Sequence, residues 1–407
     1  MREFGLHTLL KSDSSRKLSL FAFLYFCEGA PIGLVWWALP PELSSRGIPI
    51  ETITLLTGSL AIPWALKFLW GPVIDRLRFP GLTYPRWVGF FQIGMAISLV
   101  PIVFSGGADN ELLWLCLLCH AIFASAQDVA TDAWAIQISQ SSIRGLLNGV
   151  MQMGMIFGRW LFGAGLLMAS TMITFEQATS LLLGFLFLSA CILLLHPRLQ
   201  HWGEISNKVQ SGATIFKSIS GRRVILALVC AISAGLGYEA FGAVVGPFLQ
   251  SLGYSKLVVG WFYTFSLVAM GAGSLLGGKI ADRVGHYRVY MFSILAVFSV
   301  IGIIATVAQA VPHLLLLNIA FGLAIYFFIG VMISSSYAFF MDISDRSKDK
   351  ATTFSLIMAG TNACEAIASF GIGRLIPRIG YPIAFFVMGV FSIASVPFLK
   401  MNREKID

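Results

Sequence analysis

The sequence contains little charge and few polar segments. Asp, Glu, Lys and Arg make up 12% of the 407 residues, about half of the roughly 25% that is usual in soluble domains. By contrast, 57% of the residues are hydrophobic and the mean hydropathy is +0.80. The longest polar stretch between hydrophobic runs is residues 197–221, which is too short for a folded soluble domain. The composition therefore excludes a soluble globular protein and indicates an integral membrane protein.

Several motifs of chemical function are also missing. The chain has no G-x-x-x-x-G-K-[ST] phosphate loop, so we expect no ATP hydrolysis. CLLCH at 116–120 matches a haem-attachment pattern, but it lies inside a hydrophobic span, and no haem, metal ion or other cofactor is predicted. A membrane-embedded enzyme would need a nucleophile or a His/Asp pair at one interface, and a receptor would carry a long tail or loop domain. Because the sequence shows neither feature, we favour a transporter, with an enzyme or a receptor as the alternative.

Hydrophobic stretches recur along the whole chain. Each is about 20 residues long, which is enough to cross roughly 30 Å of hydrocarbon as a helix. The sequence therefore predicts an all-α membrane protein with twelve transmembrane helices. The predicted spans are residues 18–40, 52–74, 86–104, 112–137, 145–170, 178–196, 222–249, 257–280, 287–310, 313–341, 351–373 and 380–400.

The positive charges predict the orientation of these spans. With the N-terminus inside, 22 of the 28 Lys and Arg residues fall in cytoplasmic segments, as the positive-inside rule requires. Both termini are therefore expected in the cytoplasm. The net charge of +8 follows from this topology, and no nucleic-acid partner is implied.

The two halves of the chain form an internal repeat. GPVIDR at 71–76 aligns with GKIADR at 278–283, and PELSSRG at 41–47 aligns with PFLQSLG at 247–253. Repeats of this kind build many secondary transporters, whose substrate site lies near mid-membrane. The predicted parts are a tail (1–17), a six-helix half (18–196), a cytoplasmic linker (197–221), a second six-helix half (222–400) and a tail (401–407).

Two groups of motifs resemble a known transporter family. The stretch GGKIADRVGHYR at 277–288 carries the G-x-x-x-D-R-x-G-x-x-R loop of the major facilitator superfamily, after the second helix of a half. PWALKFLWGPVIDR at 63–76 and ASAQDVATDAW at 124–134 resemble a narrower branch that holds AmpG-type muropeptide permeases, acetyl-coenzyme A transporters and siderophore importers. The first-half loop departs from the superfamily pattern, with Arg78 in place of a glycine.

The resemblance implies a fold of two pseudo-symmetric six-helix halves and a location in the inner membrane of a bacterium. In the superfamily, helices 1, 4, 7 and 10 line a central cavity that opens to each side in turn. The matched loop residues are expected to have charge-network or gating roles; they are Asp75, Arg76, Asp282 and Arg283.

Charged residues inside predicted spans are candidates for function, because a charge at the centre of a membrane helix costs ~2.5–3.5 kcal/mol. Asp128 and Asp132 lie at i and i+4, and hence on one face of a helix. Two acids this close in a low dielectric favour a shared proton. Lys67 is predicted in the same half of the bilayer, where it can pair with one aspartate. The pair either couples protons or forms a structural or gating charge cluster.

Glu28 and Glu239 form a second group of candidates. Each lies near the middle of the first helix of its half, in the glycine-rich stretches CEGAPIG and GLGYEAFG. Glycine and proline around a buried carboxylate loosen a helix and release backbone carbonyls, which transporters use to bind substrates or ions. A kink without a binding role is the alternative interpretation.

Arg159 and Glu365 occupy equivalent positions in the two halves, with opposite charge. Arg159 follows Gly154 and Gly158, whose spacing is typical of a closely packed membrane helix. It is a counter-ion for a buried glutamate or a binding group for an anionic substrate, since its guanidinium can bind two oxygens at once. A third interpretation is an arginine that snorkels to the membrane surface and has no function. Glu365 joins the candidates for substrate or proton binding.

Aromatic side chains complete the list of candidates. Trp36 and Trp37 lie near the external end of the first span, where they form an interfacial belt or a stacking surface for the substrate. Tyr25 and Tyr238 are possible cavity residues.

Together these features predict a monomeric proton symporter that imports a bulky polar solute. The resemblance favours a muropeptide, with a siderophore or acetyl-coenzyme A as the alternative.

Overall fold

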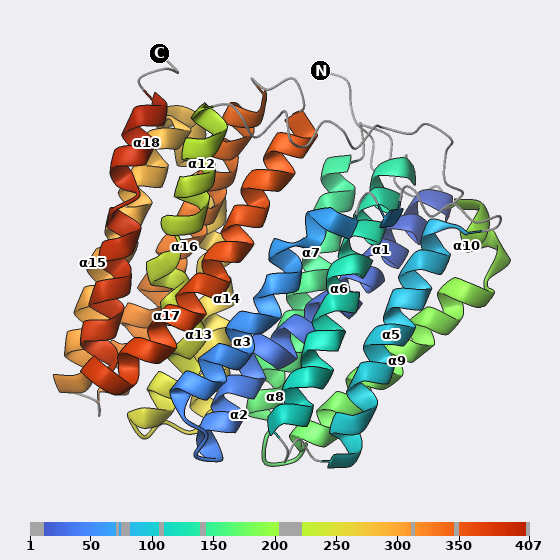
Figure 1. Ribbon diagram of the computed structural model, residues 1–407, viewed down its shortest axis with the longest axis horizontal. Coiled ribbons are helices and arrows are strands. Elements are labelled where there is room, and N and C mark those ends of the chain that lie inside the picture. Colours follow the sequence, from blue (N-terminus) through green and yellow to red (C-terminus); the bar gives the residue numbers. More distant parts are fainter. Residues whose placement is uncertain are drawn as a thin grey trace. The chain divides into compact units, whose positions relative to one another are not determined.

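The computed structural model of the protein is helical throughout the residues that it describes, and they contain no strand (Figure 1). The described residues are 12–70, 73–74, 82–105, 110–138, 144–202, 222–310, 314–345 and 350–403. The helices are α1 (Ser12–Ile32), α2 (Leu39–Ser45), α3 (Ile50–Ala65), α5 (Tyr84–Ser105), α6 (Asn110–Ile138), α7 (Arg144–Trp160), α8 (Leu166–Met168), α9 (Phe175–Leu195), α10 (Pro197–Trp202), α12 (Arg222–Ser233), α13 (Leu236–Ser251), α14 (Lys256–Val284), α15 (His286–Ala310), α16 (Leu315–Asp345), α17 (Lys350–Ile393) and α18 (Val396–Arg403). The predicted all-α fold class is confirmed.

The predicted spans correspond to these helices. Among the described residues, ten helical segments are long and apolar enough to cross a membrane, and α3 is a shorter apolar helix of 16 residues. One of the ten, Thr353–Leu399, is 47 residues long and bends at Gly380, whose φ of 73° is left-handed. This segment therefore accommodates two predicted spans, and the twelve spans are accounted for.

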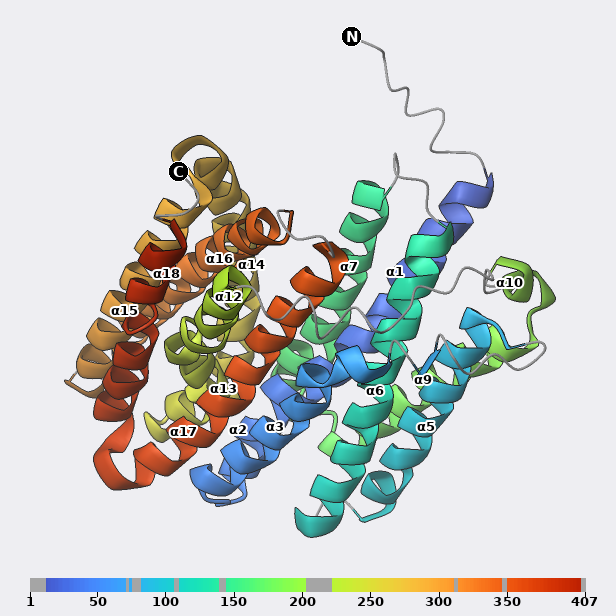
Figure 2. The same ribbon diagram turned by 45° about the horizontal axis from the view of Figure 1, so that its top comes forward.

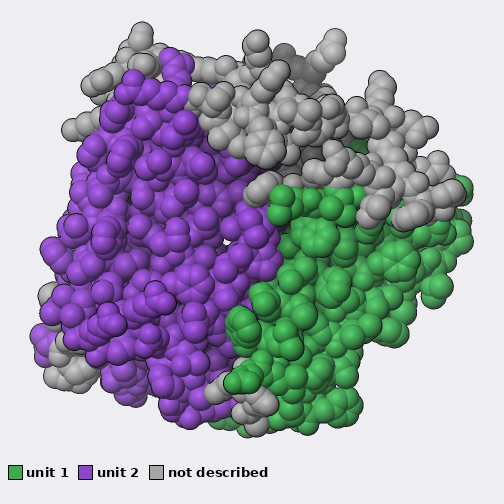
Figure 3. Space-filling model, viewed as in Figure 1, with its two compact units in different colours: residues 1–38, 69–208 green, residues 39–68, 209–407 purple. Residues whose placement is uncertain are grey.

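The chain divides into two compact units, coloured separately in Figure 3. Unit 1 consists of residues 1–38 and 69–208, and unit 2 of residues 39–68 and 209–407. Residues 39–68, which contain α2 and α3, are thus grouped with helices of the second half of the sequence.

Unit 1 is held together by close helix crossings. In it, α5 packs against both α6 and α9, and α1 packs against α7 (Figures 1 and 2). A Cβ atom on Gly29 or Gly154 would overlap the backbone of the facing helix, at Met155 and Ala22 respectively. A Cβ on Gly158 would lie only 2.8 Å from the backbone nitrogen of Ala30. The close packing predicted from the glycines of α7 is therefore confirmed for Gly154 and Gly158.

Unit 2 is also held together by close helix packing at glycine residues. The helices α14 and α16 pack together, and a Cβ atom on Gly273 would overlap the carbonyl group of Phe327. The helix α3 lies alongside α17 (Figure 2), where the Asn362 amide donates a hydrogen bond to the backbone oxygen of Trp64 over 3.2 Å.

Several spans are irregular close to their candidate carboxylates. After Pro31 the first span widens into a π-helix, Gly33–Ala38, and the seventh is interrupted between α12 and α13 at residues 234–235. Both irregularities lie within about two turns of Glu28 and Glu239, as the glycines and prolines predict. In the second span α3 ends at Ala65, two residues after Pro63, and the chain tightens into a 3-10 turn over Lys67–Leu69. The predicted continuous helix over 52–74 is therefore interrupted at residues 66–69.

Candidate transport site

Three carboxylates of unit 1 gather around one tyrosine hydroxyl. The Tyr25 hydroxyl of α1 donates a hydrogen bond to Oδ1 of Asp132 on α6. Glu28 and Asp128 also lie close enough to interact electrostatically with Tyr25. Glu28 is 3% exposed and Asp128 is 5% exposed, whereas Asp132 is partly buried. The structure therefore brings together four of the predicted site residues, and we call them the acidic cluster.

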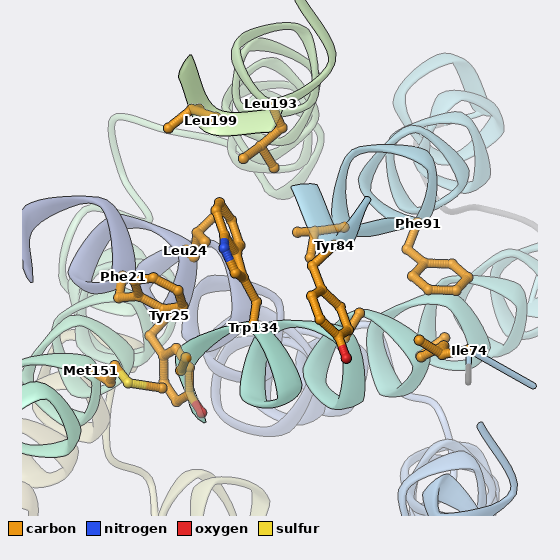
Figure 4. Close-up of a cluster of buried hydrophobic side chains, with 14 residues drawn as sticks. Phe21, Leu24, Tyr25, Ile74, Tyr84, Phe91, Trp134, Met151, Leu193 and Leu199 are labelled. Atoms are coloured by element: carbon orange, nitrogen blue, oxygen red, sulfur yellow. The ribbon is translucent and has the colours of Figure 1, made fainter. Parts of the chain in front are cut away.

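Helical spacing places these side chains on facing surfaces. Tyr25 and Glu28 are three residues apart on α1, and Asp128 and Asp132 are four apart on α6, so each pair shares one helix face. The two helices are joined just beside the cluster by the rings of Phe21 and Trp134, whose centroids are 5.1 Å apart. In Figure 4, Tyr25 lies beside Met151 of α7 within this apolar core.

The acidic cluster combines three carboxylates with one hydroxyl, and two of the three acidic side chains are almost fully buried. Carboxylates that are close together and shielded from water repel one another when all are ionised, and uptake of a proton relieves that repulsion. The tyrosine hydroxyl links α1 to α6 at the same point, so a change in the charge of Asp132 alters a contact between two helices.

Unit 2 contains a related but less acidic group. The Glu239 carboxylate of α13 forms a hydrogen bond with the Tyr238 hydroxyl, and it interacts electrostatically with Tyr326 of α16 and Cys364 of α17. Glu365, the neighbour of Cys364, also interacts with that thiol. Glu239 and Glu365 are both partly buried. A carboxylate surrounded by tyrosine hydroxyls offers several hydrogen-bonding groups to a polar solute.

The other predicted residues of unit 1 lie at the irregular end of the first span. Trp36 and Trp37 are partly buried within the π-helix, where Trp37 packs against Gly163. The backbone of Arg159 lies directly against Gly33, and its guanidinium reaches the sulfur of Met155 at 3.9 Å. Arg159 therefore packs against the first residue of the π-helix that follows α1, and its predicted roles stay open.

The predicted charge network is described only in part. Asp75 and Arg76 lie outside the described residues. Lys67 is the first residue of the 3-10 turn and is partly buried. It belongs to unit 2, whereas Asp128 and Asp132 belong to unit 1, so their pairing stays a prediction.

The loop of the second half, residues 277–288, lies within the described residues and contains a contact that the sequence did not predict. Asp282 and Arg283 are exposed, and His286 lies between Asp282 and Asp342. Its Nδ1 is 2.6 Å from Oδ2 of Asp342, and its Nε2 is 3.3 Å from Oδ1 of Asp282. Both ring nitrogens donate only when the imidazole is doubly protonated, so this geometry favours the charged histidine. In that form His286 links α14 to α16.

The sequence predicted the acidic residues of these groups but not all of the residues that contact them. Tyr326 and Asp342 become relevant only because α16 packs against α14 and α15, and no spacing in the sequence indicates this. Tyr25 could be found, since it precedes Glu28 by one helical turn, but its bond to Asp132 depends on the contact between α1 and α6.

Comparisons with known proteins agree with this architecture. The sequence profile of the Major Facilitator Superfamily matches residues 227–406. The chain is 23% identical to putative transporter AmpG 1 of Rickettsia bellii, over 97% of this chain and 100% of that protein. It is 22% identical to putative transporter AmpG 4 of Rickettsia felis, over 93% and 94% of the two chains. Among solved structures, a bacterial homolog of the human lysosomal transporter Spinster superposes with a TM-score of 0.66 at 16% identity, covering 95% of each chain.

Proposed function

Because the chain belongs to the major facilitator superfamily and is a multi-pass membrane transporter, we propose that it imports a muropeptide-type solute together with protons. In this proposal the transporter works as a monomer in the bacterial inner membrane, with both termini in the cytoplasm. Its two repeat-related parts, residues 18–196 and 222–400, alternate in exposing the solute site to each side.

The acidic cluster supports proton coupling. A hydrogen bond from Tyr25 to Asp132 joins α1 to α6, and Glu28 and Asp128 lie beside the same hydroxyl. In the low dielectric of a membrane protein, charges of the same sign that lie close together repel one another strongly, which makes such a group a candidate to carry a proton. We propose that this cluster carries the coupled proton, and that the Glu239 group and Arg159 contact the solute.

The choice of solute rests on likeness to relatives. The full-length matches to AmpG transporters favour a muropeptide over the other substrates of the same branch. A solute with sugar hydroxyls and a peptide carboxylate would suit both the tyrosine-rich surroundings of Glu239 and the guanidinium of Arg159. A siderophore importer or an acetyl-coenzyme A transporter is the second candidate.

The test is uptake into proteoliposomes that contain the purified protein. A labelled anhydro-sugar peptide should accumulate when the outside is made acidic, and a protonophore should abolish the accumulation. An unlabelled siderophore or acetyl-coenzyme A that competes fully, while muropeptides do not, would replace the proposed solute. Uptake that is the same with and without a pH gradient would contradict proton symport.

A variant separates proton coupling from solute binding. Glu28→Gln should lose accumulation under a pH gradient but retain exchange of labelled for unlabelled solute, because exchange needs no net proton movement. Glu111→Gln changes an exposed carboxylate at the start of α6 in the same way and serves as the matched control. Loss of both activities in Glu28→Gln alone would assign Glu28 to the solute instead.

A further inference from the structure

An ion pair joins the first half of the sequence to the second within unit 2. The Nζ atom of Lys256, the first residue of α14, lies 2.6 Å from Oε2 of Glu42 on α2. The other carboxylate oxygen, Oε1, accepts a hydrogen bond from Nε of Arg46 over 2.9 Å. Both oxygens of Glu42 are therefore engaged. The Glu42 and Lys256 side chains are 23% and 26% exposed, so the pair is partly shielded from water.

The segments that carry this pair are repeat-related connectors. PELSSRG and PFLQSLG occupy equivalent positions in the two halves, and each ends in a left-handed glycine, with φ of 79° at Gly47 and 88° at Gly253. Both connectors are predicted on the external side. Pro41 of the first connector also packs against Gly246, the residue before the second connector, where a Cβ atom would lie only 2.6 Å from Cγ of Pro41.

The segment of residues 39–68 is bounded by irregular backbone. It begins where the π-helix Gly33–Ala38 ends, and it finishes inside the 3-10 turn Lys67–Leu69. Such departures from α-helical geometry often mark hinges. Between them, α3 packs on α17 so closely that a Cβ atom on Gly373 would overlap the side chain of Thr54.

We propose that Glu42, Lys256 and Arg46 form a latch that holds the external side of the transporter closed. The inference rests on alternating access, which is part of the proposed function, and not on the solute or on protons. For the solute site to open outward, the external connectors of the two halves must separate. The Glu42–Lys256 pair joins those connectors, so it must break in each cycle.

The latch sets how often the external side opens. Removing Glu42 leaves Lys256 without this ion-pair partner, and removing Lys256 leaves Glu42 paired with Arg46 of its own half. Either change removes the ion pair that joins α2 to α14 and so favours their separation. We expect about a fivefold to tenfold rise in the population of the outward-open state. Arg46→Gln should have a smaller effect, because Arg46 belongs to the same half as Glu42 and only orients its carboxylate.

Accessibility to a thiol reagent measures that population without any need for transport. Leu249, one turn after Gly246 on α13, is 3% exposed, so Leu249→Cys can serve as a reporter of opening at the connectors. A membrane-impermeant maleimide added outside should label it five to ten times faster in Glu42→Gln and in Lys256→Gln. The double variant should be no faster than either single one, and Glu51→Gln, which alters an exposed acid at the start of α3, should not change the rate.

Cross-linking provides the second test and does not depend on removing a charge. In Glu42→Cys/Lys256→Cys, a short reducible thiol cross-linker should stop solute exchange, and a reducing agent should restore it. Unchanged labelling in both single variants, or additive effects in the double variant, would overturn the latch. Exchange at the full rate while the cross-link is intact would also overturn it, because α2 and α14 would then move as one body. Because labelling is measured without solute or a proton gradient, failure of the muropeptide or proton proposals leaves this result unaffected.

Discussion

Replacement of Gly29 by alanine should destabilise the protein and uncouple the acidic cluster. A Cβ atom at this position would lie 2.7 Å from the carbonyl carbon of Met155 and 2.8 Å from its Cα. Carbon atoms in contact prefer about 3.5–4.0 Å, so α1 and α7 must move apart by about 1 Å. The obstructing atoms are backbone, and no change of rotamer can relieve the overlap.

The change in stability caused by Gly29→Ala is the sum of two opposing effects. Overpacking of a well-packed core costs about 1–3 kcal/mol, and the rigid backbone at Met155 places Gly29→Ala in the upper part of that range. Alanine gains up to ~1 kcal/mol over glycine in helix propensity, which offsets only part of the cost. At Gly184, on α9 of the same unit, a Cβ atom meets nothing within 4 Å, so Gly184→Ala should be neutral or stabilising by up to ~1 kcal/mol. The two variants should therefore differ by roughly 2–3 kcal/mol.

The assay compares the thermal unfolding of the two variants in one detergent, together with solute exchange in proteoliposomes. Gly29 follows Glu28 directly and lies one turn from Tyr25, so a displacement of α1 by about 1 Å stretches the bond to Asp132. Proton-driven accumulation should then fall more than exchange does. If Gly29→Ala unfolds at the same temperature as Gly184→Ala, the inferred close crossing of α1 and α7 is wrong.

Three further changes test the individual contacts. Tyr25→Phe removes the hydrogen bond to Asp132 and should reduce proton-driven accumulation at least tenfold, with exchange largely retained. Tyr238→Phe removes a hydroxyl from Glu239 and should raise the solute concentration needed for half-maximal uptake about threefold to tenfold, with the proton dependence unchanged. The hydrogen bond with Asp342 raises the pKa of His286, so the charged form stabilises the contact between α14 and α16 and is lost as the pH rises. The unfolding temperature should therefore fall as the pH rises above the ordinary histidine pKa of about 6.5. In His286→Gln this pH dependence should be weaker, and an equal dependence would exclude the histidine.

The spans and the internal repeat could be predicted because each depends on residues that are close together in the chain. Hydrophobic length alone locates a membrane helix, since its backbone bonds are satisfied within the segment. The same holds for the close-packing role of Gly154 and Gly158, which follows from their spacing on α7. The end of α3 at Ala65 is an exception, because Pro63 lies inside this helix and nothing in the sequence predicts the 3-10 turn that Lys67 begins.

The partners of the buried charges could not be predicted in the same way. Tyr25 and Asp132 are 107 residues apart, and their bond requires α1 to approach α6 at one particular height. Likewise, Glu42 and Lys256 are both ordinary loop charges in the sequence, and only the packing of α2 against α13 brings their ends together. Many weak contacts together determine which face of a helix meets its neighbour and at which position along the axis. The sequence pattern of one segment does not contain this information.

The comparison of the two halves assigns different tasks to their buried acids. Aligned by the repeat, the second half has Ser334 and Ala338 where the first has Asp128 and Asp132, and Ser334 and Ala338 lie within the regular helix α16. The two aspartates are therefore not required by the fold, although each would cost ~2.5–3.5 kcal/mol at the centre of a membrane helix. Because the fold does not require these aspartates, the free-energy cost of placing them in a membrane helix is best explained by a function. Since the repeat would tolerate neutral residues there, this difference between the halves supports the proposal that the acidic cluster carries the coupled proton and that the Glu239 group contacts the solute.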